Sequence, residues 1–201
     1  MEFRSLAEAN PRLAKADSTF FDWLVLNYSD AMAIGVRRQV DPHRDAVSLR
    51  RVLEEVAARP QLVSRTAFVV RYRGKRPRNT DGGRLEHEAL REIGHKRFDE
   101  LAGTGRPSLK AVDVKRDLRR LRVAEGRLRR FANRRVAHRD HRAVRSLPTF
   151  AELHAAVESI AEIVIKYSEL LGLDAPRRLV PVWQSDWRRI FRYAWLEQKE
   201  T

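Results

Sequence analysis

Hydrophobic residues recur at intervals of three and four along most of the chain, which is the spacing of one face of an α-helix. The clearest case lies between Thr149, a typical N-cap, and Gly172, a typical end signal. The apolar stripe between them consists of Phe150, Leu153, Val157, Ile160, Val164, Tyr167 and Leu171. Because this stripe has no gap, the stretch predicts a helix that packs along one face in a bundle.

A second strong helix signal lies near the N-terminus. Asp17-Ser18 can cap a helix that runs to about Val40, where Asp41-Pro42 ends it. The residues expected to recur along its packed face are Phe20, Trp23, Leu24, Asn27, Ala31 and Ile34. Residues 1–16 predict a shorter helix ahead of it.

The middle of the chain predicts three more helices. Ser48 is expected to cap the first of them. Its packed face is expected to carry Leu49, Val52, Leu53 and Val56. Pro60 opens the second; the stretch 66–72 also fits a strand, but the lack of a partner strand favours helix. The third covers residues 84–101 and follows a basic, glycine-containing loop at 74–83.

A long helix is expected to start at Ser108 or Asp113 and to continue into the most basic part of the chain. Gly126 is expected to kink it, because glycine weakens a helix interior by about 1 kcal/mol. Beyond residue 172 the chain is expected to be extended until Ser185-Asp186 caps a short C-terminal helix.

These elements together predict an all-α fold, an antiparallel bundle with long central helices and a short C-terminal helix. We expect a single domain over residues 1–201, because no linker or internal repeat divides the chain. Its core is expected at about 17–172, followed by a C-terminal extended segment and short helix at 173–201.

The composition adds a strong and unevenly distributed positive charge. Lys and Arg number 41 against 27 Asp and Glu, which gives a formal net charge of +14. Residues 115–145 hold 13 basic and 3 acidic residues, so +10 of that charge lies in one segment. A local positive field of this kind favours a polyanion, most often nucleic acid. The alternative is a solvated helix face rich in arginine.

Several classes of site and location are disfavoured. The chain has no cysteine, which excludes disulfides and thiolate metal sites. No apolar run approaches the roughly 20 residues of a membrane span, and no secretory signal is present, so we expect a soluble, cytoplasmic protein without membrane contact. Glu88, Glu92 and His95 share one helix face but lack matching ligands elsewhere, so no metal or other cofactor is expected.

The most promising chemistry lies in residues 127–142. On a continuous helix Arg134 and Arg130 lie within about 80° of His138, and Asn133 joins them only if the helix bends or ends. Histidine transfers protons near neutral pH, and arginine matches phosphate oxygens. This arrangement therefore predicts a phosphodiester site. The alternative is that His138 packs at a helix end with the arginines in solvent.

The order of motifs along residues 17–195 resembles the HEPN (higher eukaryote and prokaryote nucleotide-binding) superfamily, and more closely its abortive-infection U-type (AbiU-like) branch. The motifs that carry this resemblance are Trp23, Tyr28 and Ala31; Asp41 followed by Ser48-Leu49; Ala58-Arg59-Pro60; the run from Asn133 to His138; the run from Pro148 to Leu153; Tyr167; and Pro181 followed by Asp186-Trp187.

The resemblance implies a helical bundle that often forms a homodimer, with the motif helices of two subunits meeting in one cleft. Active HEPN proteins are metal-independent ribonucleases, commonly toxins or antiphage effectors. Their signature is an arginine, a polar residue, a short spacer and a histidine. Here Asn133 matches the polar residue and His138 the histidine, but Ala132 stands where the arginine is expected.

The first hypothesis is therefore a HEPN-type ribonuclease or RNA-binding effector of prokaryotic defence or toxin–antitoxin systems, which cleaves RNA by 2′-OH transesterification. His138, Asn133, Arg134 and Arg130 would be its catalytic residues. The residues expected to bind the nucleic acid are Arg127, Arg135, Arg139 and Arg142. The expected partners are RNA, a second copy of the chain, and an antitoxin or other defence protein.

Two alternatives belong to other functional classes. Because Ala132 replaces the expected arginine, the chain can be a catalytically inactive HEPN module that binds nucleic acid or a regulatory protein partner. It can also be a purely structural helical protein with an incidental basic face.

Overall fold

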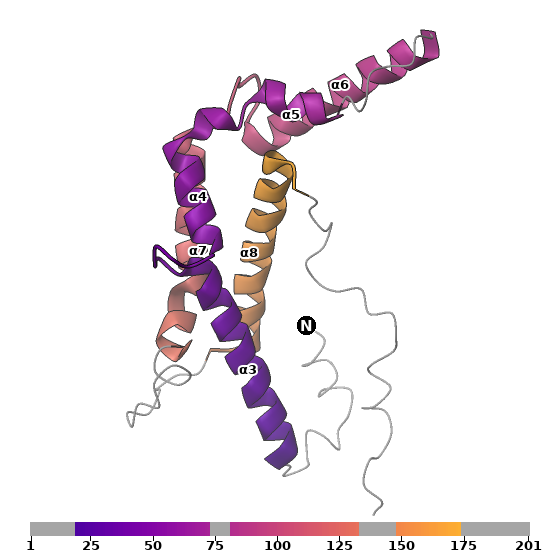
Figure 1. The fold of residues 1–201 in the computed structure, drawn as a ribbon. Coiled ribbons are helices and arrows are strands. Elements are labelled where there is room, and N and C mark those ends of the chain that lie inside the picture. Colours follow the sequence, from indigo (N-terminus) through magenta and orange to yellow (C-terminus); the bar gives the residue numbers. More distant parts are fainter. Residues whose placement is uncertain (1–18, 73–80, 133–147, 174–201) are drawn as a thin grey trace, which may run out of the picture.

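The computed structural model describes residues 19–72, 81–132 and 148–173, and it confirms the all-α prediction for them (Figure 1). The described residues contain no strand, only an isolated antiparallel bridge between Ser64 and Ser108. The elements are α3 (Thr19–Val40), α4 (Leu49–Ala58), the 3-10 turn η1 (Pro60–Leu62), α5 (Arg65–Tyr72), α6 (Asp81–Ala102), α7 (Ala111–Phe131) and α8 (Phe150–Leu171). None of these helices is long and apolar enough to cross a membrane.

Helix α7 is the centre of the bundle. It packs against α3, α4 and α8, while α3 also packs against α8 (Figure 1). Its inward face consists of Val114, Leu118, Leu121, Leu128 and Phe131, all of which are buried. This face follows the three- and four-residue spacing of the sequence, so the hydrophobic pattern of α7 accounts for its central position.

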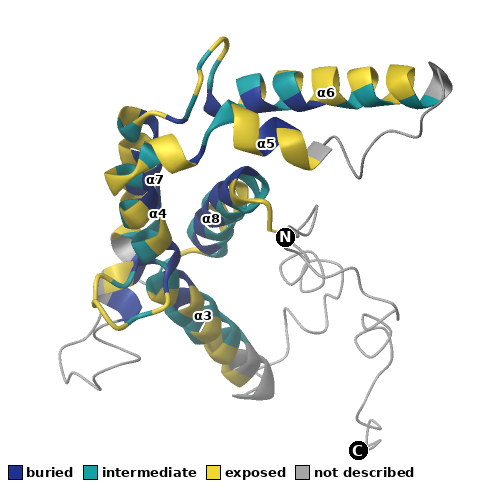
Figure 2. Ribbon diagram, turned by 45° about the horizontal axis from the view of Figure 1, so that its top comes forward, coloured by how far each residue is buried: buried dark blue, intermediate teal, exposed yellow. Residues whose placement is uncertain are grey.

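Helices α5 and α6 form a pair at one end of the bundle, and α6 extends away from the other helices (Figures 1 and 2). Phe68 of α5 stacks edge-on against Phe98 of α6, with ring centroids 5.4 Å apart. Phe98 and Ala102 are buried, whereas no residue between 84 and 93 is. The pair is therefore anchored through the C-terminal part of α6.

Helix α8 begins and ends as its sequence predicts. Glu152 N–H donates to Thr149 Oγ1 at 3.2 Å and Thr149 N–H donates to Glu152 Oε2 at 2.9 Å, which completes a capping box. Gly172 closes the helix in the left-handed conformation with φ 73°. A Cβ atom at this position would also overlap the guanidinium of Arg71, which donates to Leu170 O at 2.6 Å.

Replacing Thr149 with alanine is expected to destabilise the protein by about 1 kcal/mol, because it removes the hydroxyl that accepts from Glu152 N–H and donates to Glu152 Oε2. Urea denaturation of the full chain measures this change. Thr104→Ala, in an exposed turn, is the matched control and should change the free energy of unfolding by less than about 0.5 kcal/mol. Equal effects of the two substitutions would contradict a capping role.

The predicted packed face of α3 is wrong at Trp23, Asn27 and Ala31, whereas Ile34 is half-buried. The side chains of Phe20 and Leu24 lie outside the described residues. Ala33, Val36 and Val40 are buried, whereas Trp23 is 56% exposed and Ala31 is exposed. The exposure of these residues follows from where α8 begins along α3. Helix α8 begins beside the middle of α3, where Tyr28 contacts Phe150, and the first turns of α3 extend past it (Figure 1). Only the C-terminal half of α3 is therefore packed against several helices.

The predicted cap of α7 is also wrong. Its N-cap is Lys110, which forms no side-chain cap bond. Ser108 instead lies in the bridge to Ser64, where the flanking Leu109 N–H donates to Val63 O at 3.0 Å. Asp113 lies inside the first turn and binds arginines. Both predicted capping residues are thus engaged in other contacts.

The structure also tests the predictions for Ser48, Pro60 and Gly126. Ser48 caps α4 as predicted, with its Oγ accepting from Arg51 N–H at 3.3 Å. Pro60 opens only a short 3-10 turn, so the helix starts at Arg65, and the strand alternative for 66–72 is wrong. The kink predicted at Gly126 is confirmed, since its backbone has φ 21° and ψ −112°.

Candidate functional site

Most of the predicted site lies outside the residues that the structure describes. This applies to Asn133, Arg134, Arg135, His138, Arg139 and Arg142. Arg127 and Arg130 belong to the last turns of α7, but their side chains are also outside the described part. The described residues nearest to the motif are the end of α7 and the start of α8, and the predicted roles stay predictions.

The first flanking element is the end of α7. Phe131 and Ala132 are only 2% and 1% exposed and belong to the hydrophobic core. Ala132 is the residue expected to match the arginine of the HEPN signature, and the structure places a buried methyl group there.

The kink at Gly126 separates the last turns of α7 from the rest of the helix. A Cβ atom there would meet nothing within 4 Å, so the positive φ, rather than crowding, is what favours glycine. Because of the kink, the faces of α7 before and after Gly126 are not those of one straight helix. Face assignments made along residues 111–125 do not carry over to Arg127 and Arg130.

The second flanking element is the start of α8, where a tyrosine–histidine pair joins α8 to α3. Tyr28 Oη lies 2.8 Å from His154 Nε2, and the tautomer of the imidazole determines which group donates. The Tyr28 ring also lies 5.9 Å from Phe150. Burial lowers the pKa of His154, so this ring is neutral at pH 7. No local pattern predicts this pair, because its members are 126 residues apart.

Helix α7 also carries a line of exposed cations, here called the α7 basic stripe: Lys115, Arg122 and Arg129. Lys115 and Arg122 are seven residues apart on the straight part of α7 and share one face over about 10 Å, whereas Arg129 follows the kink. Lys115 and Arg122 form no ion pair with any other described residue. Their charge is thus available to an external anion.

Glu125 is the only acidic residue of α7 close to the kink. Burial raises the pKa of this carboxyl group, while Arg129, Arg37 and Arg50 lower it. Burial is the larger of these effects, so the pKa of this half-buried carboxyl group is raised overall.

A cleft of about 800 Å³ runs between α7 and α8. Helix α7 contributes three arginines to it, together with Val123 and Leu128 among others, and α8 contributes small side chains. The arginines are Arg116, Arg119 and Arg120, and the small residues of α8 are Ala155, Ala156 and Ser159. The cleft reaches Gly126 on α7 and Glu152 on α8, so it ends near the helix termini that flank the motif.

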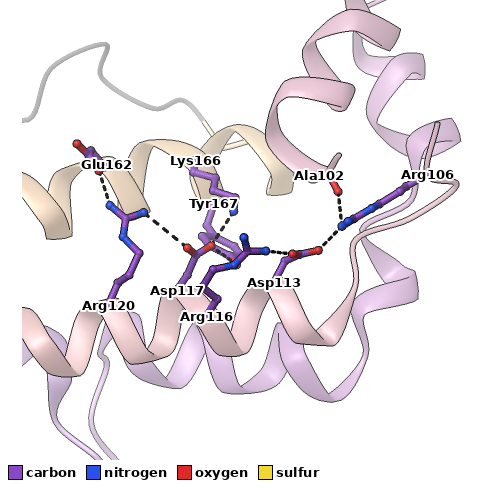
Figure 3. A network of polar contacts seen from close by, with 9 residues as sticks. All are labelled: Ala102, Arg106, Asp113, Arg116, Asp117, Arg120, Glu162, Lys166 and Tyr167. Carbon is purple, nitrogen blue, oxygen red and sulfur yellow. Dashed lines mark hydrogen bonds and ion pairs between the residues drawn. The ribbon is translucent and has the colours of Figure 1, made fainter. Parts of the chain in front are cut away.

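Beside the cleft, two buried carboxylates of α7 tie the bundle together (Figure 3). Asp117 is 4% exposed, accepts from Lys166 Nζ at 2.6 Å and from Tyr167 Oη at 3.0 Å, and lies 3.7 Å from Arg120. Asp113 binds Arg106. Burial and the Asp117 carboxylate raise the pKa of Tyr167, which keeps its phenol protonated as the donor. The network thus joins α7 to α8 structurally.

The Asp113 carboxylate extends the same network in two directions. Arg116 binds it from the next turn of α7, and Arg106, which also donates to Ala102 O at 3.0 Å, binds it from the loop after α6 (Figure 3). Arg120 continues the network on the outer side, where it donates to Glu162 Oε2 at 2.5 Å. Two of the three cleft arginines are therefore held by internal carboxylates.

Within the described ranges, no group of three or more His, Asp or Glu side chains converges. Of the residues considered as metal ligands, Glu92 forms an exposed ion pair with Lys96 at 2.9 Å. That ion pair lowers the pKa of Glu92.

Comparison with known proteins links these helices to one family. The comparison with curated proteins gave no match, and neither did the comparison with solved structures. The sequence does match the AbiU2 family of HEPN domains over residues 2–190, a range that includes every helix described above and the motif Asn133–His138. The chain therefore belongs to the AbiU2 family of HEPN domains, whose role is of HEPN type and associated with abortive infection.

Proposed function

We propose that this protein is a metal-independent endoribonuclease that acts in prokaryotic defence, with its site in the segment that joins α7 to α8. The observation that carries the proposal is the AbiU2 match over residues 2–190, because the matched range contains Asn133 and His138 at the spacing of the HEPN signature. The α7 basic stripe adds support, since it places exposed cations on the helix that enters this segment.

The proposed reaction is an internal transesterification. The ribose 2′-oxygen attacks the neighbouring phosphorus, the bond to the 5′-oxygen breaks, and the products are a 2′,3′-cyclic phosphate and a 5′-hydroxyl. His138 takes the proton from the 2′-hydroxyl or gives one to the leaving 5′-oxygen. Arg134 and Arg130 neutralise the charge that builds up on the phosphate, and Asn133 orients the histidine or the phosphate. The need for the 2′-hydroxyl restricts cleavage to RNA.

The buried Ala132 shapes this proposal. Because it supplies no cation, stabilisation of the phosphate depends on Arg130 and Arg134. The phosphates on either side of the reacting one are expected to bind Arg127, Arg135, Arg139 and Arg142. A homodimer in which two motif segments share one cleft is part of the proposal, as is an antitoxin or other defence protein as partner.

The deciding experiment incubates the purified full chain with RNA in the presence of EDTA. We expect fragments with 2′,3′-cyclic phosphate ends, and no cleavage of DNA of the same sequence. Cleavage that stops in EDTA, or fragments with 3′-hydroxyl ends, would contradict the proposed mechanism. The oligomeric state is measured on the same sample by light scattering.

A second candidate function is favoured by Ala132 itself. Without the expected arginine the chain can act as an inactive HEPN module that binds RNA or a regulatory protein. The same assay separates the two functions, because this module binds RNA without producing cyclic phosphate ends.

Charge removal on the α7 basic stripe is expected to weaken RNA binding in a salt-dependent way. Replacing Lys115, Arg122 and Arg129 together with alanine should lower the slope of log affinity against log salt by about 2, if each cation neutralises one phosphate of single-stranded RNA. Fluorescence anisotropy over a salt series measures this slope.

The matched control removes one lysine and two arginines elsewhere. Arg44, Arg59 and Lys96 are exposed and lie outside α7. Their replacement with alanine should leave the slope within about 0.5 of the original. If both triple variants lower the slope equally, only the net charge matters and the stripe has no specific role.

A further inference from the structure

The cleft between α7 and α8 has a floor that is mainly apolar and a basic rim. Ala124 and Leu128 of α7 line it together with Ala155 and Ala156 of α8. Val123 also faces it and is 78% exposed, so an apolar side chain stands in water at the cleft. Small residues on α8 let a third helix approach closely, which is the usual reason for small side chains where helices pack.

The rim carries positive charge that the protein neutralises only in part. Arg116 binds Asp113, and Arg120 binds Glu162 and lies near Asp117. Arg119 lines the cleft, is exposed, and forms no ion pair with any other described residue. Arg119 could therefore pair with a carboxylate on an occupant of the cleft. Arg116 and Arg120 are also positioned to do so, because the network in Figure 3 orients them.

The dimensions of the cleft suit a short helix. Its straight wall on α7 runs from Arg116 to Gly126, where ten residues of helix at 1.5 Å each span about 15 Å, and Leu128 lines it beyond the kink. A partner helix of about 12 to 14 residues covers this length. Its apolar side chains at three- and four-residue steps would reach the floor, as in other complexes where a helix binds in a groove.

Charge argues against the other candidate occupants. A second copy of the chain brings a further net charge of +14. The chain's own segment 174–201 is basic as well, with Arg188, Arg189 and Arg192 beside its aromatic residues. RNA would meet the arginines but would lay its phosphates against an apolar floor, where they lose solvation without gaining partners.

We infer that the cleft between α7 and α8 is a docking groove for an acidic amphipathic helix of a protein partner. Its apolar face covers Val123 and the alanines of α8, and its carboxylates pair with Arg119 and the neighbouring arginines. Because the groove reaches Gly126 and Glu152, the bound helix bridges the two helix ends that the motif segment connects. This inference does not depend on ribonuclease activity.

The test exploits the absence of cysteine, which allows a single label in the full chain. Ser159→Cys carries an environment-sensitive fluorophore in the groove, and Thr66→Cys, exposed on α5, carries the same label as control. The probe is a synthetic peptide of about 14 residues with leucine at three- and four-residue steps and glutamate elsewhere. Its matched partner has lysine in place of glutamate.

We expect the glutamate peptide to change the emission of the label at residue 159 and not that at residue 66, while the lysine peptide changes neither. Arg119→Glu and, separately, Val123→Asp should each weaken peptide binding at least tenfold. Both residues are exposed, so both variants should fold as the original does. Arg38→Glu, a charge reversal on the exposed side of α3, should leave binding within twofold.

Three results would overturn the inference. If an RNA oligonucleotide shifts the groove label and the acidic peptide does not, the groove belongs to RNA. If deletion of residues 1–18 or 174–201 shifts the label without any ligand, the chain fills the groove itself. If neither peptide shifts it, the groove is not a helix-docking site. RNA cleavage, measured separately with His138→Ala, reports on the proposed function alone.

Discussion

Replacing His138 with alanine is expected to lower the rate of RNA cleavage by about 10²- to 10⁴-fold, which is the usual contribution of a general acid or base. In the proposed mechanism no other side chain of the segment is assigned the proton transfer, so water would have to replace it. The measurement is single-turnover cleavage of an end-labelled RNA in EDTA, with product ends identified as cyclic phosphates.

The matched control is His141→Ala, three residues further along the same basic segment. It removes an equivalent imidazole to which no role in the reaction is assigned, so cleavage should stay within threefold of the original. RNA affinity should be nearly unchanged in both variants, because the arginines remain. Full activity of the His138 variant would falsify the catalytic assignment, and lost binding by both variants would point to misfolding instead.

Replacing Asp117 with alanine is expected to destabilise the protein by about 3 kcal/mol or more. The carboxylate is 4% exposed and is the common acceptor for Lys166 and Tyr167 of α8. Removing it leaves an ammonium group without its partner and a buried hydroxyl without its acceptor, a change that typically costs about 3–5 kcal/mol. Urea denaturation of the full chain, followed by circular dichroism, measures the loss.

Glu162 provides the control within the same network. It binds Arg120 at 2.5 Å, but its side chain is 67% exposed, and solvent screens such a pair. Glu162→Ala should therefore cost less than about 1 kcal/mol. If the two substitutions destabilise the protein equally, burial is not what makes Asp117 important. Asp117→Asn, which keeps the shape, should fall between them.

The boundaries of helices were most predictable where local chemistry determines them. Thr149 and Gly172 delimit α8 because a capping box and a left-handed residue are properties of a few neighbouring residues. Gly126 bends α7 for the same local reason. The start of α7 was mispredicted because Ser108 is engaged by Ser64, which is distant in sequence, and Asp113 by Arg106 of the preceding loop. A cap predicted from its own neighbours cannot take such contacts into account.

Which face of a helix is buried depends on where its neighbours begin and end. The spacing of apolar residues in α3 is helical throughout, yet Trp23 is exposed because α8 starts beside Tyr28. In α8 the apolar stripe was largely right, because α8 is packed along its whole length. The hydrophobic pattern thus predicts the type of element, and the arrangement of the bundle determines which of its apolar residues are buried.

The same difference between local and long-range features applies to the candidate site. Asn133 and His138 could be proposed from sequence because their spacing is a property of one short segment, and their roles stay predictions. The sequence could not predict that Asp117 pairs with Lys166 and Tyr167, because these residues lie 49 and 50 positions further along the chain. The same holds for the groove between α7 and α8, whose two walls carry no joint signal in the sequence.

The projection of α6 has an energetic consequence. Its C-terminal part is held by the Phe68–Phe98 contact and by the pairing of Arg97 with Glu169 of α8 at 2.6 Å, whereas Leu85 and Ile93 in its N-terminal part are 69% and 51% exposed. One continuous helix therefore has two levels of stability. The anchored part unfolds only with the bundle, while the projecting part opens at a cost set by local helix propensity and pairs such as Glu92–Lys96.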